Sequence, residues 1–365
     1  MKQVIVSVTN DITTDQRVHK VCTSLTEMNF NVTVIGRKLK NSIPINRKYS
    51  TLRFKLLFNK GVLFYAEYNL RLFLKLLFTK KDILLANDLD TLLPNYFASK
   101  IFKTKLVYDS HELFTEVPEL IDRTFVKNTW LRIEKFIVPK LKHNYTVCNS
   151  IANYYNSKYN TNFKTLRNLP FKTTNNLNGT FPFNTNNQKI ILYQGALNKG
   201  RGLELMIETM KRIDNAIFVI IGSGDVEKQL VLQVKKLNLQ EKVKFISKIT
   251  PKALQKLTPL ADLGLSIEED LGLNYRFALP NKVFDYIQAQ VPILVSDLIE
   301  MKQIVEQYNV GEIILDRSPT ALANQITAML QKGKSLYSKQ LIKASNELIW
   351  EKESKKLIEI INNLE

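Results

Sequence analysis

The sequence predicts an α/β protein made of two Rossmann-like halves, and three features support this prediction. Short runs of almost wholly apolar residues alternate with segments whose apolar residues recur every three or four positions. Strands that are apolar on both faces are typical of parallel sheets covered by helices. Residues 171–187 interrupt this alternation near the middle of the chain, because they are rich in Asn and Thr and lack periodicity. We therefore expect an N-terminal domain (1–170), a linker (171–187) and a C-terminal domain (188–344), with a cleft at the carboxyl ends of both sheets.

The expected strands are the apolar runs, which lie on both sides of the linker. They are 4–8, 32–35, 83–86, 106–108, 144–147, 190–193, 217–221, 243–246, 263–267 and 293–295. Helical spacing predicts helices at 16–28, 127–142, 203–212, 225–237, 281–289 and 319–331. The final segment, 345–365, is helical by pattern and is a candidate to pack back onto the first domain.

The composition excludes several classes of protein. The chain has 365 residues, of which 45% are apolar, and this suits two buried cores rather than a disordered or fibrous chain. Two cysteines and three histidines are too few for a disulfide framework or a Cys/His zinc site, so we expect a reducing cytosol. No apolar run reaches the roughly 18 to 20 residues of a membrane-spanning helix. The apolar part of the opening is also too short for a secretory signal.

The net charge of +18 favours anionic partners such as nucleic acid, anionic lipid or a phosphorylated substrate. Compositional drift toward Lys, Asn and Ile is an equally good explanation of much of this charge. The basic residues are dispersed and form no recognised nucleic-acid-binding motif, so nucleic acid is not an expected partner.

A glycine-punctuated loop between a predicted strand and a predicted helix is the first candidate site. Gly195, Gly200 and Gly202 let the backbone approach a ligand closely, and Arg201 lies next to the start of the helix. Helix-end amides and a guanidinium both bind phosphate oxygens. An ordinary turn with a solvent-exposed arginine is the alternative interpretation.

The second candidate site lies where Pro280 begins a predicted helix. Asn281, Lys282 and Asp285 fall within the first turn or so, and spacings of three and four residues place them near one face. A cation, an amide and a carboxylate at one helix end match a nucleoside diphosphate, with Lys282 near phosphate and Asp285 accepting from two ribose hydroxyls. The alternative is a surface ion pair between Lys282 and Asp285.

These motifs also occur in a recognisable order. The first half contains SVTNDITTDQRVHK, ANDLDTLLP and KLVYDSHEL, and the second half contains QGALNKGRGLELMIETM, IIGSGDVEKQL, ADLGLSI and LPNKVFDYIQAQVPILVSD. In this order they resemble the family-4 (group 1) glycosyltransferases of the GT-B fold, over essentially the whole chain. The resemblance implies a nucleotide-sugar donor site in the second domain and an acceptor cleft in the first.

In the second half, three positions depart from the family's pattern. Ala196 occupies the position where members commonly have an arginine, which leaves Arg201 as the expected phosphate ligand. Phe277 and Asp285 occupy the positions of a pair of glutamates. The first position is therefore apolar, and only Asp285 keeps a carboxylate, one CH₂ group shorter. Asp285 remains the candidate for binding the ribose hydroxyls.

The resemblance also implies roles in the first domain. His111 is similar to a histidine beside the donor sugar, where it hydrogen-bonds a hydroxyl and supports charge in the transition state. A histidine packed at a strand end is the alternative. Asp109 and Glu112 flank it on the acceptor side, where they orient its ring, bind acceptor hydroxyls or simply form the loop. Arg17 and His19 fit an acceptor phosphate and a plain surface equally well, and we leave them outside the catalytic set.

Asp88 and Asp90 have the spacing of the D-x-D metal clamp found in the other glycosyltransferase fold. We do not assign them to a metal, because two Rossmann-like domains with Arg201 and helix ends can bind a diphosphate without one. We therefore expect no metal, and no cofactor beyond a UDP- or GDP-sugar donor.

Residues 51–82 combine Phe, Leu and Tyr with seven Lys and Arg residues. A basic amphipathic helix of this kind can lie on an anionic membrane, which would serve an enzyme with a lipid-linked acceptor. The alternative is a core-facing helix with solvated lysines.

We expect a metal-independent glycosyltransferase that acts on a lipid-linked or cell-surface polysaccharide precursor, and the resemblance implies that it retains the anomeric configuration. We expect it in the cytoplasm, peripheral at the inner face of the membrane. A non-catalytic nucleotide-sugar-binding scaffold, favoured by Ala196 and Phe277, and a nucleotide-sugar 2-epimerase on the same fold are the alternatives.

Overall fold

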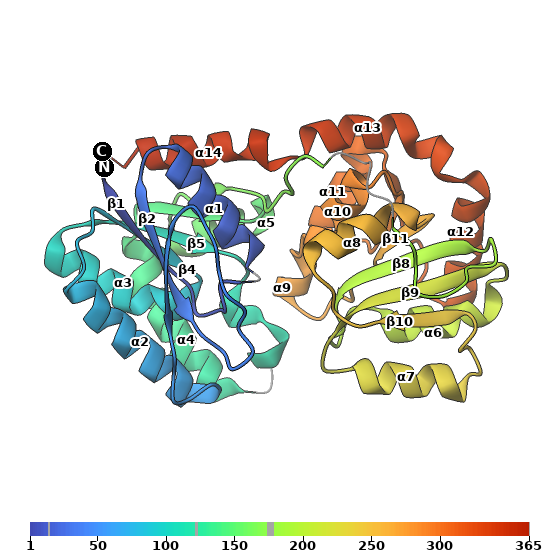
Figure 1. The fold of residues 1–365 in the computed structure, drawn as a ribbon, viewed down its shortest axis with the longest axis horizontal. Coiled ribbons are helices and arrows are strands. Elements are labelled where there is room, and N and C mark those ends of the chain that lie inside the picture. Colours follow the sequence, from blue (N-terminus) through green and yellow to red (C-terminus); the bar gives the residue numbers. More distant parts are fainter. Residues whose placement is uncertain (14, 121–122, 174–178, 365) are drawn as a thin grey trace. The chain divides into compact units, whose positions relative to one another are not determined.

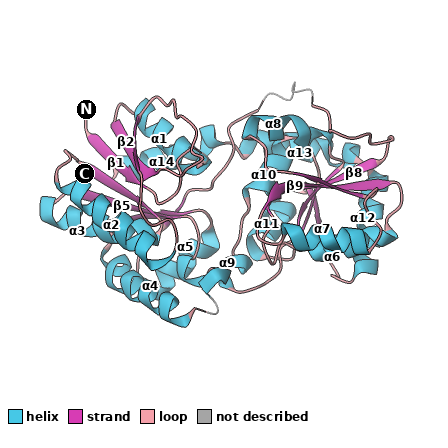
Figure 2. Ribbon diagram, turned by 60° about the horizontal axis from the view of Figure 1, so that its bottom comes forward, coloured by secondary structure: helices cyan, strands magenta, loops and turns pink. Residues whose placement is uncertain are grey.

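The chain folds into two compact units, each built on one parallel β-sheet covered by helices (Figures 1 and 2). The computed structural model describes residues 1–13, 15–120, 123–173 and 179–364. The first unit contains Met1–Asn168 together with the chain from Glu353 onward, and the second contains Leu169–Lys352. The expected α/β class with two Rossmann-like sheets is confirmed.

The sheet of the first unit has seven parallel strands in the order β3-β2-β1-β4-β5-β6-β7. These strands are β1 (Gln3–Ser7), β2 (Asn31–Arg37), β3 (Ser50–Phe54), β4 (Ile83–Asn87), β5 (Lys105–Ser110), β6 (His143–Thr146) and β7 (Lys164–Thr165). The α-helices of this unit are α1 (Gln16–Glu27), α2 (Gly61–Leu77), α3 (Leu89–Phe102), α4 (Thr124–Ile137), α5 (Asn149–Tyr159) and most of α14 (Trp350–Asn362).

Burial and capping explain why these segments fold as they do. Val4, Ile5 and Val6 of β1 are fully buried, because helices cover both faces of the sheet. The side chain of Asp15 accepts a hydrogen bond from the backbone N–H of Val18 and so caps the start of α1. Helices α2 and α3 pack against each other, as do α3 and α4, and the end of α14 lies beside the N-terminus (Figure 1).

The sheet of the second unit has six parallel strands in the order β10-β9-β8-β11-β12-β13. They are β8 (Lys189–Ala196), β9 (Ala216–Ser223), β10 (Val243–Ile246), β11 (Leu263–Ser266), β12 (Ile293–Val295) and β13 (Gly311–Ile313). Its α-helices are α6 (Leu203–Thr209), α7 (Glu227–Lys236), α8 (Pro251–Leu257), α9 (Leu273–Arg276), α10 (Asn281–Gln288), α11 (Ile299–Tyr308), α12 (Pro319–Lys332) and α13 (Ser338–Glu347). One apolar core runs through the buried faces of these elements.

Three expectations need correction. Residues 51–82 are not helical throughout, because β3 forms the edge of the first sheet and the helix begins only at Gly61. The segment 345–365 is not one helix, since α13 ends at Glu347 and α14 begins at Trp350, with Leu348 and Ile349 buried between them.

The third correction concerns the linker expected at 171–187. Residues 174–178 lie outside the described residues. At the described end of the segment, the rings of Phe181 and Phe183 stack with centroids 5.3 Å apart and pack against the second-unit core. That end is therefore part of the second unit rather than an exposed connection.

Candidate functional site

The glycine loop that follows β8 is fixed against the segment that follows β11. Gly200 and Gly202 have positive φ angles of 80° and 72°, a conformation that glycine adopts without strain. A Cβ atom on Gly202 would lie 2.3 Å from the carbonyl oxygen of Ile267, so a side chain cannot be accommodated there. The backbone N–H of Glu269 donates to the carbonyl of Gly200 at 2.8 Å. This close approach brings Arg201 next to Glu268.

Glu268 is the centre of a buried ion cluster in the second unit. Its Oε1 atom lies 2.7 Å from Nζ of Lys282 and 3.5 Å from a guanidinium nitrogen of Arg201. Ser266 donates its hydroxyl to the other carboxylate oxygen at 2.8 Å. Arg317 holds the backbone, because its guanidinium donates to the carbonyl oxygens of Ile267 and Glu268 at 3.0 and 3.3 Å. We call Arg201, Glu268 and Lys282 the Glu268 cluster.

The charges of the Glu268 cluster are not balanced. Among the described residues, Arg201 and Lys282 form ion pairs with the same single carboxylate, that of Glu268. One positive charge is therefore left over. Burial alone would raise the pKa of Glu268, but Lys282 and Arg201 outweigh it and hold the pKa below its ordinary value. The side chains of Glu268 and Lys282 are 0% and 7% exposed, whereas that of Arg201 is 26% exposed. A ligand can therefore reach the excess charge through Arg201.

Aromatic rings complete the surroundings of the two cations. The ammonium of Lys282 lies 4.0 Å from the ring centroid of Tyr193, and the guanidinium of Arg201 lies 5.1 Å from that of Tyr275. The hydroxyl of Tyr275 donates to the carbonyl of Lys199 at 2.8 Å. Both cations are thus held in place by contacts on more than one side.

Asp285 is held separately from Lys282, although both belong to α10. The side-chain amide of Gln194 donates to Asp285 at 3.1 Å, and the amide oxygen of Gln194 accepts from Thr258 at 2.9 Å. Lys282 pairs with Glu268, so the alternative of a surface ion pair between Lys282 and Asp285 is wrong. Asn281 is the exposed first residue of α10.

The departures from the family's pattern lie near this site. The carbonyl of Ala196, at the end of β8, accepts a hydrogen bond from the hydroxyl of Tyr193 at 2.7 Å. Phe277 follows α9 and is partly buried. The glycine loop, Arg201 and Lys282 are thus brought together around Glu268, and Gln194 links Asp285 to the end of β8.

A second ion cluster lies at the carboxyl ends of β4 and β5 in the first unit. Arg17 of α1 donates two hydrogen bonds to the two carboxylate oxygens of Asp109, at 2.9 and 2.7 Å. A third guanidinium hydrogen bond, at 3.0 Å, reaches the carbonyl of Leu166. Arg17 and Asp109 are both buried. Arg17 is therefore no surface residue, and the buried carboxylate of Asp109 cannot reach an acceptor hydroxyl.

His111 lies between two carboxylates. Its Nδ1 atom is 3.1 Å from Asp88 and its Nε2 atom is 3.2 Å from Asp109. Its backbone N–H also donates to the Asp88 carboxylate at 2.8 Å. Burial alone would lower the pKa of His111, but Asp88 and Asp109 outweigh it and hold the pKa well above its ordinary value. This arrangement favours the protonated ring, in which each nitrogen can donate to one carboxylate. We call Arg17, Asp88, Asp109 and His111 the Asp109 cluster.

The remaining candidates of the first unit are placed as follows. Glu112 is an exposed residue whose carbonyl accepts from the hydroxyl of Ser110 at 2.8 Å. Asp90 is buried and accepts from the hydroxyl of Thr9 at 2.6 Å, whereas Asp88 binds His111. Burial and the nearby Asp88 raise the pKa of Asp90 to about 7. No group of three or more potential metal ligands occurs among the residues that the structure describes.

The sequence did not lead us to Glu268, and we left Arg17 outside the catalytic set. Glu268 follows a short apolar strand closely, at the carboxyl edge where ligands of such sheets bind. This position could have identified it as a candidate site residue. Arg17 carried no such signal, because its partner Asp109 is 92 residues away.

The comparisons with known proteins agree with this architecture. Residues 180–348 match the family model "Glycosyl transferases group 1". No curated protein sequence matches the chain. Among solved structures, sucrose-phosphate synthase from Thermosynechococcus elongatus has a TM-score of 0.83 at 14% identity, covering 100% of this chain and 99% of that one.

Two further solved structures are similar to the chain. HepE from Anabaena, in complex with UDP and glucose, has a TM-score of 0.76 at 14% identity with complete coverage of both chains (100% of each). The lipopolysaccharide outer core galactosyltransferase WaaB has a TM-score of 0.67 at 11% identity and covers 100% of this chain and 99% of its own. At these identities the likeness establishes the fold. The chain has the GT-B fold, and its residues 180–348 match the family model of the group 1 glycosyl transferases.

Proposed function

We propose that this protein is a retaining, metal-independent glycosyltransferase. It would move a hexosyl or related sugar from a nucleoside diphosphate sugar, with UDP or GDP as the nucleotide, onto a hydroxyl of a lipid-linked or cell-surface polysaccharide precursor. The observation that carries the proposal is the unbalanced positive charge of the Glu268 cluster. HepE is solved in complex with UDP-glucose, which supports this class of donor. WaaB, a lipopolysaccharide galactosyltransferase of the same fold, supports the class of acceptor.

In the proposed reaction, the bond between the anomeric carbon and the diphosphate oxygen breaks, and the oxygen of the acceptor hydroxyl bonds to the same face of the sugar. The proton of that hydroxyl passes to the departing diphosphate oxygen. Negative charge grows on the departing diphosphate. Arg201 and Lys282 would stabilise this charge more strongly in the transition state than in the bound substrate, which is how such contacts accelerate a reaction. No cofactor beyond the donor takes part.

Other residues of the second unit would hold the rest of the donor. Asp285, oriented by Gln194, would accept hydrogen bonds from the two ribose hydroxyls. Asn281, at the start of α10, would also contact the donor. Gly195, Gly200 and Gly202 would let the backbone approach the diphosphate.

The first unit would act on the sugar and the acceptor. His111 would exchange its ring hydrogen bond to Asp88 for one to a sugar hydroxyl, and would support the charge of the transition state. Asp109 would be a positioning residue that fixes the ring, because it contacts His111 and is itself buried. Glu112, exposed beside His111, would bind an acceptor hydroxyl. Residues 51–82 would bring the enzyme to an anionic membrane that carries the acceptor.

Calorimetric titration with UDP and GDP tests the donor site. We expect native protein to bind one of them and Arg201→Ala to bind it at least about tenfold more weakly, because a charge-assisted phosphate contact is lost. Arg212→Ala is the matched control, since Arg212 is a half-exposed arginine of the same unit that pairs with Glu208. Equal binding by native protein and Arg201→Ala would show that the diphosphate lies elsewhere.

A panel of nucleotide sugars, scored by nucleotide release with crude membrane lipid as acceptor, tests turnover. If the protein binds a nucleotide but releases none from any donor sugar, a non-catalytic scaffold is favoured. Ala196 and Phe277 suggest this alternative, because they replace polar residues of the family. A donor epimer detected by mass spectrometry in the absence of acceptor would instead identify a 2-epimerase.

A further inference from the structure

Helix α2 exposes apolar side chains along one side of its length. Val62, Leu70, Leu74 and Phe78, together with Ala66, follow each other at intervals of four residues. Leu70 is 60% exposed and Phe78 is 87% exposed. The opposite side of α2 is also apolar and is buried in the first unit. The polar residues Glu67, Asn69, Arg71 and Lys75 lie between these two sides. A continuous run of exposed apolar side chains along a helix indicates a binding surface.

Helix α3 extends this surface. It packs against α2, and the two helices lie next to each other in both views (Figures 1 and 2). Phe97 and Ile101, four residues apart, are exposed, and so is Phe102 at the end of the helix. We define the α2–α3 face as Val62, Leu63, Leu70, Leu74, Phe78, Phe97, Ile101 and Phe102.

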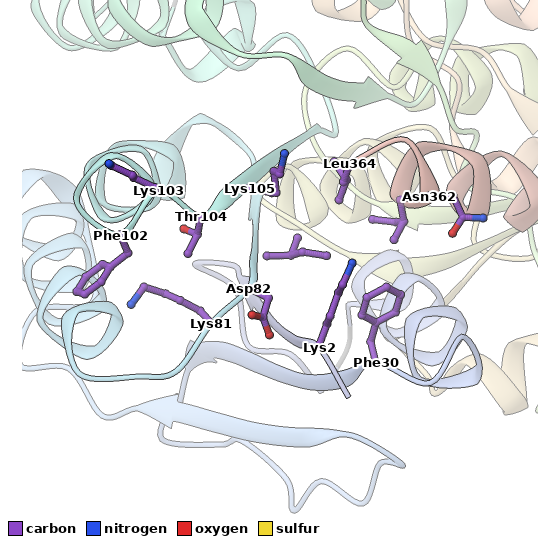
Figure 3. A pocket seen from close by; sticks show the side chains of 12 residues that line it. Lys2, Phe30, Lys81, Asp82, Phe102, Lys103, Thr104, Lys105, Asn362 and Leu364 are labelled. Carbon is purple, nitrogen blue, oxygen red and sulfur yellow. The ribbon is translucent and has the colours of Figure 1, made fainter.

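Lysines surround the end of the α2–α3 face. A cavity of about 620 Å³ opens beside the last residue of α3 (Figure 3). Its lining includes four lysines and one carboxylate, namely Lys2, Lys81, Lys103, Lys105 and Asp82. Phe102 belongs to both the face and the cavity, and its ring centroid lies 3.5 Å from the Lys81 ammonium. Apolar side chains and the exposed lysines Lys103 and Lys105 therefore meet at one place.

Part of the cavity lining is apolar. Ile83, Ile361 and Leu364 line it and are almost fully buried. Lys81 donates to the carbonyl oxygens of Leu76 and Thr79 at 2.6 and 3.0 Å, so it ties the end of α2 to the cavity. Lys103 and Lys105 are exposed at the rim. A phosphate at the rim would meet these ammonium groups without being buried.

We propose that the α2–α3 face docks on the surface of an anionic phospholipid bilayer, with the exposed Lys103 and Lys105 at the cavity rim against the lipid phosphates. The exposed leucines and phenylalanines would enter the acyl boundary, and the lysines would lie at headgroup depth. A second copy of the chain is the poorer occupant, because two such faces would bring their lysines together. The proposal deepens the proposed function, on which its purpose rests, since a lipid-linked acceptor is presented at such a surface.

Flotation of the full chain with vesicles tests the proposal. The vesicles contain phosphatidylcholine alone, or phosphatidylcholine with one third phosphatidylglycerol. We expect native protein to partition onto the anionic vesicles at least about tenfold more strongly, because several lysines each contribute near the surface. Equal partition onto both vesicles, or onto neither, would overturn the proposal.

Two pairs of variants locate the surface. Leu70→Asn with Leu74→Asn should weaken partition about tenfold or more, whereas Leu232→Asn with Leu315→Asn should not, because those exposed leucines belong to the second unit. Lys103→Gln with Lys105→Gln should lower the preference for phosphatidylglycerol, whereas Lys235→Gln with Lys236→Gln on α7 should leave it unchanged. If either pair of variants in the first unit behaves like its control, the surface is wrongly placed.

Two further measurements separate the possible outcomes. A change of oligomeric state in Leu70→Asn with Leu74→Asn, without vesicle binding by native protein, would assign the face to a second copy and contradict the proposal. UDP titration of the same samples is independent of the membrane. Intact nucleotide binding together with absent vesicle binding would overturn the docking surface alone.

Discussion

The Asp109 cluster and the Glu268 cluster lie at corresponding edges of the two sheets but differ in their charge balance. In the first unit, the cations Arg17 and His111 face the carboxylates Asp109 and Asp88, and every charge has an opposite partner. In the second unit, two cations share Glu268, and the more exposed of them is Arg201. A balanced cluster holds side chains in position, whereas an unbalanced one also attracts an anion.

Removing the central carboxylate of each cluster should produce the largest effects and separate the two roles. Asp109→Asn should lower the free energy of unfolding by about 3 to 5 kcal/mol, because Arg17 is then left buried without its counter-ion. Glu268→Gln should cost a similar amount for the same reason at Lys282. Urea denaturation of both variants measures these losses.

A nucleoside diphosphate should then distinguish the two variants. In Glu268→Gln the ligand's phosphates replace the missing negative charge, so UDP or GDP should raise the melting temperature more than it does in native protein. In Asp109→Asn the shift should equal the native one. Equal shifts in both variants would mean that the charge imbalance has no connection with ligand binding.

Removing the accessible cation should affect turnover more than stability. Arg201→Ala should reduce the rate of sugar transfer at least about a hundredfold, the usual cost of losing a group that stabilises charge in the transition state. Its melting temperature should stay close to that of Arg212→Ala, because Lys282 still pairs with Glu268. Full activity in Arg201→Ala would show that the excess positive charge of the Glu268 cluster does not serve sugar transfer.

The pH dependence of stability should report the balanced cluster, with a smaller effect. The folded-state pKa of His111 lies above its unfolded value of about 6.5. Its ion pairs therefore stabilise the fold fully below that unfolded value and less as the pH rises through the folded one. The difference in unfolding free energy between native protein and His111→Gln should accordingly be largest near pH 6 and shrink toward alkaline pH. A difference that grows with pH would mean that the ring is neutral.

The fold was predictable from the sequence wherever burial leaves a simple pattern. The fully buried strands β1 and β9 are continuous apolar runs and were expected within one or two residues of their ends. Strand β3 was missed because it is an edge strand with polar residues such as Arg53 between apolar ones. Helix α3 was missed because most of its residues are buried on every side, including Pro94, so it lacks a polar face that would reveal its period.

The candidate site was predictable only in its local parts. Gly200, Arg201 and Gly202 form a continuous motif, and Lys282 begins a helix, so each could be recognised by its neighbours. Glu268 contacts Arg201 in the loop after β8 and Lys282 in α10, and sequence spacing does not encode these contacts. Arg17 and Asp109 likewise meet only because α1 packs against the end of β5.

The most direct test of the account is a crystal structure of the protein with UDP or GDP. We expect the diphosphate to lie within hydrogen-bonding distance of Arg201, next to Gly202 and the start of α10 at Asn281 and Lys282. Diphosphate density away from these residues, or no bound nucleotide at saturating concentration, would contradict the claim that the Glu268 cluster holds the leaving group.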